Sequence, residues 1–85
     1  MLNKGSMRKK TLEDMRTEII REIKSEQEKG TLGGPLDFEA KWETLRKPIF
    51  DNPVVSASFV YLDITEEEIK GMLRGAYDEC GVELA

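Results

Sequence analysis

The sequence predicts a small, mainly α-helical domain of three or four helices. Apolar residues recur at helical spacing in three separate stretches of the chain. Each stretch opens on a threonine cap or a proline, and both are helix start signals. Residues 54–62 are the one candidate strand, and a lone strand leaves its backbone hydrogen bonds without partners inside the chain.

The composition favours a single domain with a thin core. The 85 residues are 39% hydrophobic and 35% charged, with a net charge of −4, which is close to the average for folded domains. A core of this size supplies only roughly 3–5 kcal/mol of net stability, so pairing with a second copy would help. The sequence lacks an apolar run near the ~20 residues that cross a membrane. Because the lone cysteine cannot form an intrachain disulfide, we expect a cytoplasmic protein.

Residues 1–10 are polar and show no apolar period, so we expect a flexible tail or a remnant of cloning. An amphipathic helix is predicted over residues 11–29, with Thr11 as its N-cap. Its apolar stripe is too short for a coiled coil and can dock on the chain's own core or on a second chain. Both alternatives stay open. The stripe consists of Leu12, Met15, Ile19, Ile20 and Ile23, of which Leu12, Ile19 and Ile23 are candidate partner contacts.

Residues 30–35 (Gly-Thr-Leu-Gly-Gly-Pro) predict a hinge, and residues 36–85 a compact helical domain. The glycines do not form a phosphate loop, because no Lys-Ser or Lys-Thr pair follows them. A second helix is predicted from Leu36 to Lys47, with Pro48 as its stop. It carries Trp42 on an apolar face, a position that is usually part of a core.

Residues 54–62 allow two interpretations. Three valines and two aromatic residues favour a strand. Asn52 followed by Pro53 is instead a good helix start. We favour a short buried helix. The alternative is an α+β fold in which this segment pairs with itself across a dimer.

The last helix is the clearest element of the chain. Thr65 and Glu68 have capping-box spacing, and Ile64 and Ile69 flank them as a hydrophobic staple. Gly81 follows the apolar stripe and predicts the end of the helix.

One face of this helix is a candidate contact surface. Gly71 and Gly75 lie four residues apart on the side away from the apolar stripe. Each glycine costs about 1 kcal/mol of helix stability relative to alanine. Such a pair allows a close approach by another backbone. We therefore predict a partner-binding surface formed by these glycines with Lys70, Arg74 and Asp78.

Catalysis is poorly supported by the sequence, and we predict no catalytic residue, metal site or cofactor. The chain contains no histidine, the usual general base and metal ligand. Cys80 lies at a helix C-terminus, which disfavours a reactive thiolate. The acidic residues do not form a calcium loop.

The sequence therefore predicts a non-enzymatic protein–protein interaction module that self-associates and acts as a regulator or inhibitor of a larger complex. Its protein partner is not identified by the sequence. The alternative is a nucleic-acid-associated regulator that uses the basic residues 8–10. This is not favoured, because residues 30–85 carry five basic and eleven acidic side chains.

Overall fold

The computed structural model describes residues 3–31 and 35–83 of the chain. They form four α-helices, in the order α1 (Lys4–Lys29), α2 (Pro35–Phe50), α3 (Pro53–Tyr61) and α4 (Glu66–Glu79). These described residues contain no strand, so the predicted mainly α-helical fold is confirmed. The α+β alternative is wrong, because the segment that would have formed the strand is α3.

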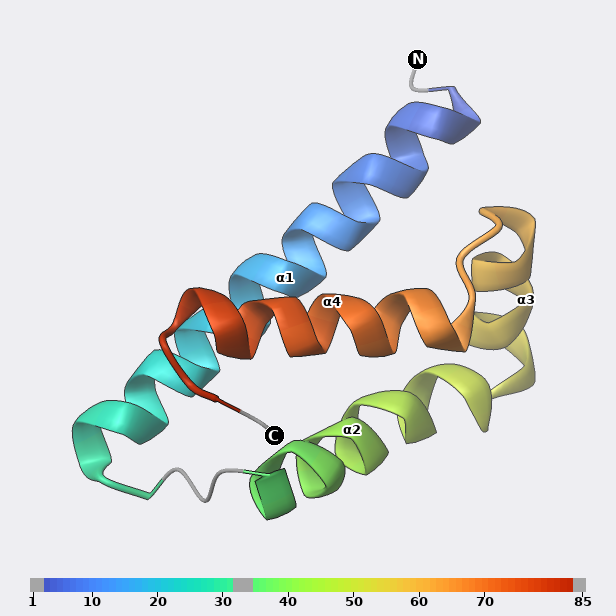
Figure 1. Ribbon diagram of the computed structural model, residues 1–85. Coiled ribbons are helices and arrows are strands. Elements are labelled where there is room, and N and C mark those ends of the chain that lie inside the picture. Colours follow the sequence, from blue (N-terminus) through green and yellow to red (C-terminus); the bar gives the residue numbers. More distant parts are fainter. Residues whose placement is uncertain (1–2, 32–34, 84–85) are drawn as a thin grey trace.

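Helix α4 lies at the centre of the arrangement. It packs against both α1 and α2, and α3 packs against α2 (Figure 1). The long helix α1 crosses α4, and its N-terminal part extends beyond it. Because α1 and α2 both pack against α4, the buried side chains of the core surround the apolar stripe that the sequence predicts for this helix.

The core draws side chains from α1, α2, α4 and the connection before α4. The two α1 residues in it, Ile19 and Ile23, are only 5% and 0% exposed. Helix α1 therefore docks on its own chain, which decides between the two alternatives left open by its sequence. The other buried hydrophobic residues are Phe38, Trp42, Ile49, Leu62, Ile64, Ile69, Leu73, Ala76 and Tyr77.

Helix α1 begins earlier than its sequence predicts. Asn3 caps it by accepting a hydrogen bond from the Ser6 amide at 2.8 Å. Thr11, the predicted cap, lies inside the helix, where its hydroxyl donates to the Met7 carbonyl at 2.8 Å. Residues 4–10, expected to be a tail, are thus helical. An ion pair between Arg8 and Glu68 of α4 helps to hold them, a tertiary contact that local sequence does not reveal.

At its other end α1 stops at Gly30, which has a φ of 69°. This left-handed conformation suits glycine. Residues 32–34 of the predicted hinge lie outside the described residues, as do residues 1–2 and 84–85 at the chain ends.

Helix α2 continues through Pro48 to Phe50, so the predicted stop at Pro48 is wrong. A proline removes one helical hydrogen bond. Here packing stabilises the helix beyond the missing hydrogen bond. Ile49 is buried, and the Phe50 ring packs edge to face on the Phe59 ring of α3, with ring centres 6.2 Å apart.

Residues 54–61 of the predicted segment are helical, as expected, but of the whole segment 54–62 only the cap residue Leu62 is buried. The Asn52 side chain caps α3 by accepting a hydrogen bond from the Val54 amide at 3.0 Å. None of the α3 residues is buried, and Val54, Val60 and Tyr61 are 76%, 71% and 60% exposed. The reason is that α3 packs through one side only, on α2.

Both ends of α4 lie where the sequence predicts them, and of the predicted capping box the structure shows the bond to Thr65, while the Glu68 carboxylate pairs with Arg8. The Thr65 hydroxyl accepts a hydrogen bond from the Glu68 amide at 3.1 Å. Gly81 has a φ of 77°, and the Val82 amide donates to the Tyr77 carbonyl at 2.9 Å. This pattern is a Schellman motif that satisfies the last carbonyls of the helix.

Candidate functional site

Gly71 and Gly75 lie on the exposed side of α4, away from the core, as their spacing predicts. A methyl group added at either glycine would meet no described atom within 4 Å. Neither glycine is therefore required by packing inside the described part of the chain. Asp78, one turn further on, is also exposed.

Lys70 and Arg74 lie beside these glycines, but they also contact α2. The Lys70 ammonium lies 5.9 Å from the centre of the Trp42 ring. The Arg74 guanidinium lies 5.1 Å from the centre of the Phe38 ring. Cation–π contacts of this kind contribute about 0.5–1 kcal/mol at exposed sites. The two cations thus cover the edge of the α2–α4 contact.

The structure does not place the α1 candidates beside this glycine face. Leu12 is half-buried and packs against the core. Ile19 and Ile23 are core residues, so their assignment as partner contacts is corrected: their side chains are not accessible to a partner.

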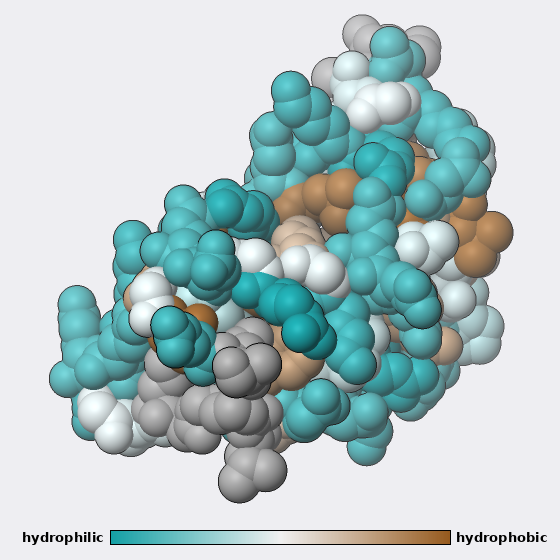
Figure 2. All heavy atoms as spheres, in the orientation of Figure 1, coloured by the Kyte–Doolittle hydropathy of each residue, from teal (hydrophilic) through white to brown (hydrophobic). Residues whose placement is uncertain are grey.

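A different surface, which the sequence does not predict, lies on α3. Among the described residues four large hydrophobic side chains are exposed, and three of them belong to this helix. Figure 2 shows apolar atoms at the right-hand edge of the molecule, where Figure 1 places α3. The exposed residues cover about 160° of the helix surface. This surface, the α3 face, consists of Pro53, Val54, Ala57, Ser58, Val60 and Tyr61.

The α3 face is uncharged, although 35% of the chain is charged. The small residues Ala57 and Ser58 lie at its middle, with Val54 near one end and Val60 and Tyr61 at the other. The absence of charge from nine consecutive residues was the signal available in the sequence. An uncharged, apolar segment predicts a buried helix, because apolar residues usually lie inside a fold.

The N-terminal part of α1 borders this surface. The Lys4 ammonium lies 5.1 Å from the centre of the Tyr61 ring and 3.0 Å from the Asp63 carboxylate. Met7 is 40% exposed and follows Lys4 by one helical turn. These contacts place a cation at the C-terminal end of the α3 face.

A polar cluster joins α1, α2 and α4 beneath the surface. The Tyr77 hydroxyl donates to the Asp37 carboxylate at 2.6 Å. The Lys41 ammonium lies 2.8 Å from Glu26 of α1, 3.7 Å from Glu22 and 3.9 Å from Asp37. The cluster thus links three helices through charge-assisted contacts.

Both proton donors of this cluster hold their protons tightly. Burial and the hydrogen bond to Asp37 raise the pKa of Tyr77. Burial lowers the pKa of Lys41, but the hydrogen bond to Glu26 and the surrounding carboxylates outweigh it, so the pKa is raised overall. A general acid or base works best with a pKa near the working pH. The cluster is therefore suited to holding helices together.

The basic segment at residues 8–10 is largely paired. Arg8 pairs with Glu68, and the Lys10 ammonium lies 3.3 Å from the Asp14 carboxylate. Pairing with carboxylates lowers the positive potential that phosphate binding needs.

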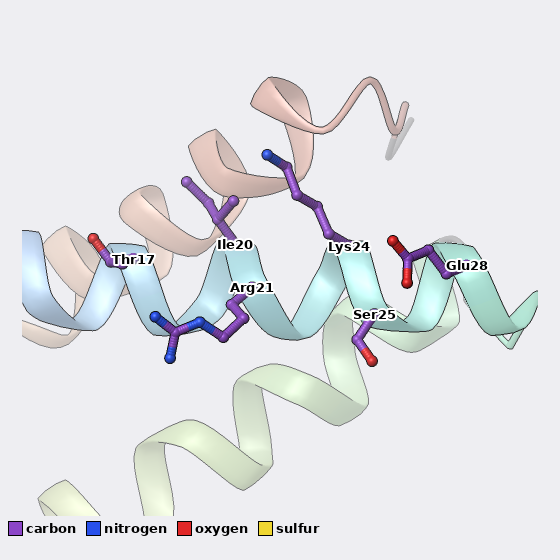
Figure 3. Close-up of a pocket in the computed structure, with 6 residues that line it drawn as sticks. All are labelled: Thr17, Ile20, Arg21, Lys24, Ser25 and Glu28. Atoms are coloured by element: carbon purple, nitrogen blue, oxygen red, sulfur yellow. The ribbon is translucent and has the colours of Figure 1, made fainter.

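The hollows of the surface are shallow. Figure 3 shows one whose six lining residues all come from α1; Ile20 and Lys24 project to one side, and Arg21 and Ser25 to the other. A second hollow, of about 220 Å³, lies between α1 and α2 beside Leu45. It is smaller than the roughly 300–1,000 Å³ of typical small-molecule sites, whereas the hollow in Figure 3, of about 400 Å³, falls within that range but is lined by a single helix.

Within residues 3–31 and 35–83, no group of three or more Cys, Asp or Glu side chains is placed to hold a metal ion. In the same part of the chain, none of the helices has the length and apolarity needed to cross a bilayer. No protein-family model, curated protein or solved structure matches the chain.

Proposed function

We propose that the chain is a small, non-enzymatic protein–protein interaction module, a self-associating regulator or inhibitor of a larger complex that acts in the cytoplasm. The observation that carries this proposal is the α3 face, where Val54, Val60 and Tyr61 are exposed together on an uncharged helix. Apolar residues scattered singly over a surface are normal. A contiguous group of them is typical of an interaction site.

The packing of α3 supports this proposal. Val55 and Phe59 already face the core, so the helix is anchored to the domain without its outer side. The apolar side chains of the outer side add nothing to that anchoring. Removing them from water in a complex would contribute about 25 cal/mol per Å² of apolar surface.

The glycine face of α4 is a second contact surface within the same proposed function. Gly71 and Gly75 lower helix stability by about 1 kcal/mol each relative to alanine. Since no described atom would obstruct an alanine there, close approach by an external backbone is a reason for glycine.

The proposal is tested with two matched variants, Ala57→Arg and Ala40→Arg. Both alanines are exposed and helical, but only Ala57 lies on the α3 face. Arginine is a good helix former, so both variants should fold. Tagged wild type and variants are incubated with native lysate, with and without nuclease, and the retained proteins are quantified by mass spectrometry.

The proposal requires that wild type and Ala40→Arg retain one protein in stoichiometric amount and that Ala57→Arg loses it. This protein can be a different protein or an untagged copy of the chain. Equal retention by all three proteins would remove the α3 face, the observation that carries the proposal, as the contact surface. Retention that disappears with nuclease, together with binding to nucleic acid that weakens as salt rises, would favour the nucleic-acid alternative.

A further inference from the structure

We infer that the α3 face binds the same face of a second copy of this chain, with the two α3 helices antiparallel about a two-fold axis near Ala57 and Ser58. This inference rests on the proposed function and names its partner. Three observations carry it: the absence of charge on the face, its shape, and the charges at its two ends.

The charge distribution favours a second copy over a charged partner. Each chain has a net charge of −4, so most pairs of surfaces on two copies repel each other. The α3 face carries no charge and can meet its own copy without that repulsion. A strongly charged partner would instead lose water from its charges and gain no compensating pair here.

The shape of the face is complementary to itself. The nine residues of α3 span about 14 Å. At their middle Ala57 and Ser58 are small, and small residues let two helices approach closely. An antiparallel pair then places Val54 of one copy against Val60 and Tyr61 of the other. Large side chains therefore fill the space at both ends while small ones meet at the crossing.

The ends of the face also match in this orientation. Each end of the face carries an ion pair: Lys4, beside Tyr61 at the C-terminal end, lies 3.0 Å from Asp63, and the exposed Asp51, before the N-terminal cap, lies 3.9 Å from Arg46. The two-fold axis brings each Lys4–Asp63 pair toward the Asp51–Arg46 pair of the other copy, so that Lys4 can approach Asp51 and Arg46 can approach Asp63. The antiparallel helix dipoles are also favourable, since each N-terminus lies near the C-terminus of its neighbour.

The size of the face sets the expected strength. A standard interface buries about 800 Å² per partner, and one short helix provides less. We therefore expect a weak, reversible dimer.

The experiment is sedimentation equilibrium of wild type, Ala57→Arg and Ala40→Arg from about 10 μM to about 1 mM, a range in which weak self-association can be measured. Ala57→Arg places two like charges together at the axis and should weaken self-association at least about tenfold. Ala40→Arg carries the same added charge on α2 and should dimerise like wild type. Far-ultraviolet circular dichroism establishes that all three proteins are equally folded.

A second variant tests the axis itself and does not depend on loss of binding. In a Cys80→Ala background, Ser58→Cys should form an interchain disulfide under mild oxidation, because the axis brings position 58 close to its own copy. Thr44→Cys, on exposed α2, is the matched control and should remain unlinked.

A dimer that is lost in Ala57→Arg and cross-linked through position 58 supports the inference. A wild type that stays monomeric at about 1 mM, or a dimer that Ala57→Arg leaves intact, overturns it. The inference can fail while the proposed function stands. If all three proteins are monomers but Ala57→Arg alone no longer captures a different protein, self-pairing is wrong and the interaction module stands. If Ala57→Arg changes neither self-association nor capture, both are wrong.

Discussion

The Tyr77 hydroxyl donates a hydrogen bond of 2.6 Å to the Asp37 carboxylate, and this contact joins α4 to α2. The Tyr77 side chain is fully buried, and its ring packs edge to face against Phe38 at 5.7 Å. Asp37 in turn lies 3.9 Å from Lys41, which binds Glu26 of α1. The contact between Tyr77 and Asp37 is therefore one link in a network across three helices.

Replacing Tyr77 by phenylalanine should lower the free energy of unfolding by about 1–2 kcal/mol at neutral pH. The variant keeps the ring but leaves a partly buried Asp37 carboxylate without its donor. Urea unfolding followed by circular dichroism measures the change. Tyr61→Phe is the control, because the Tyr61 side chain is exposed, and it should stay within about 0.5 kcal/mol of wild type. Equal effects of the two variants would contradict the role assigned to Tyr77.

Stability should fall at alkaline pH because the pKa values of Tyr77 and Lys41 are raised by folding. Their ordinary pKa values are 10.0 and 10.5. Below about pH 10 both groups are protonated in the folded and the unfolded chain, and their contribution is fully present. Above it the unfolded chain loses these protons first, so the free energy of unfolding decreases as pH rises toward the raised values.

Urea unfolding of wild type and Tyr77→Phe between about pH 8 and pH 11 checks this prediction. The variant lacks the phenol, so its stability should decline less steeply above pH 10. Parallel declines would show that the Tyr77 hydroxyl does not contribute to the alkaline loss.

Gly71→Ala and Gly75→Ala should each raise the free energy of unfolding by about 1 kcal/mol, since alanine favours the helix and fits without obstruction. Binding of a partner at the glycine face should weaken at the same time. Gly81→Ala is the opposite control: its φ of 77° makes an added side chain unfavourable by about 1–2 kcal/mol. Thermal unfolding and pull-down give the two readouts. Unchanged capture by the alanine variants would remove the glycine face as a contact surface.

Ile23→Ala should destabilise the domain by about 2–5 kcal/mol, because Ile23 is fully buried where α1 meets the core. Val54→Ala, at the most exposed hydrophobic position of α3, should change the monomer by no more than about 0.5 kcal/mol. Urea unfolding at low protein concentration measures both. Wild-type stability of Ile23→Ala would mean that α1 does not dock on its own core.

Thr65→Ala should lower the free energy of unfolding by about 1 kcal/mol, because the Thr65 hydroxyl accepts the Glu68 amide at the start of α4. Thr17→Ala removes a hydroxyl that bonds only to a carbonyl within α1. Alanine has the higher helix propensity, so this control should be neutral or slightly stabilising. A loss of similar size in both variants would argue against a specific capping role.

Local interactions explain what could be predicted from the sequence. The caps of α4 depend on residues within a few positions of each other, and its apolar stripe repeats with the helical period. The same period placed Gly71 and Gly75 correctly on the exposed side. Asn52 and Pro53 likewise identified α3 as a helix, because their effect on the first turn needs no distant partner.

Long-range contacts explain what could not be predicted. The ion pair of Arg8 with Glu68 joins residues 60 positions apart, so the support that it gives to the first turns of α1 cannot be seen in the local sequence, whereas the Asn3 cap is local. The stacking of Arg74 on the Phe38 ring depends on how α4 crosses α2. Pro48 stays helical because packing of the neighbouring Ile49 outweighs one lost hydrogen bond.

The sequence by itself determined that this chain is helical, where α4 begins and ends, and which side of α4 carries its glycines, because hydrogen bonds along a helix and its 3.6-residue period are local properties. Only the tertiary structure decided that Ile23 belongs to the core and that Val60 is left in water. Both residues are apolar and helical, and what separates them is the number of neighbouring helices that cover each one. Burial is a property of the assembled fold, so the α3 face became visible only when α2 was found to cover one side of its helix.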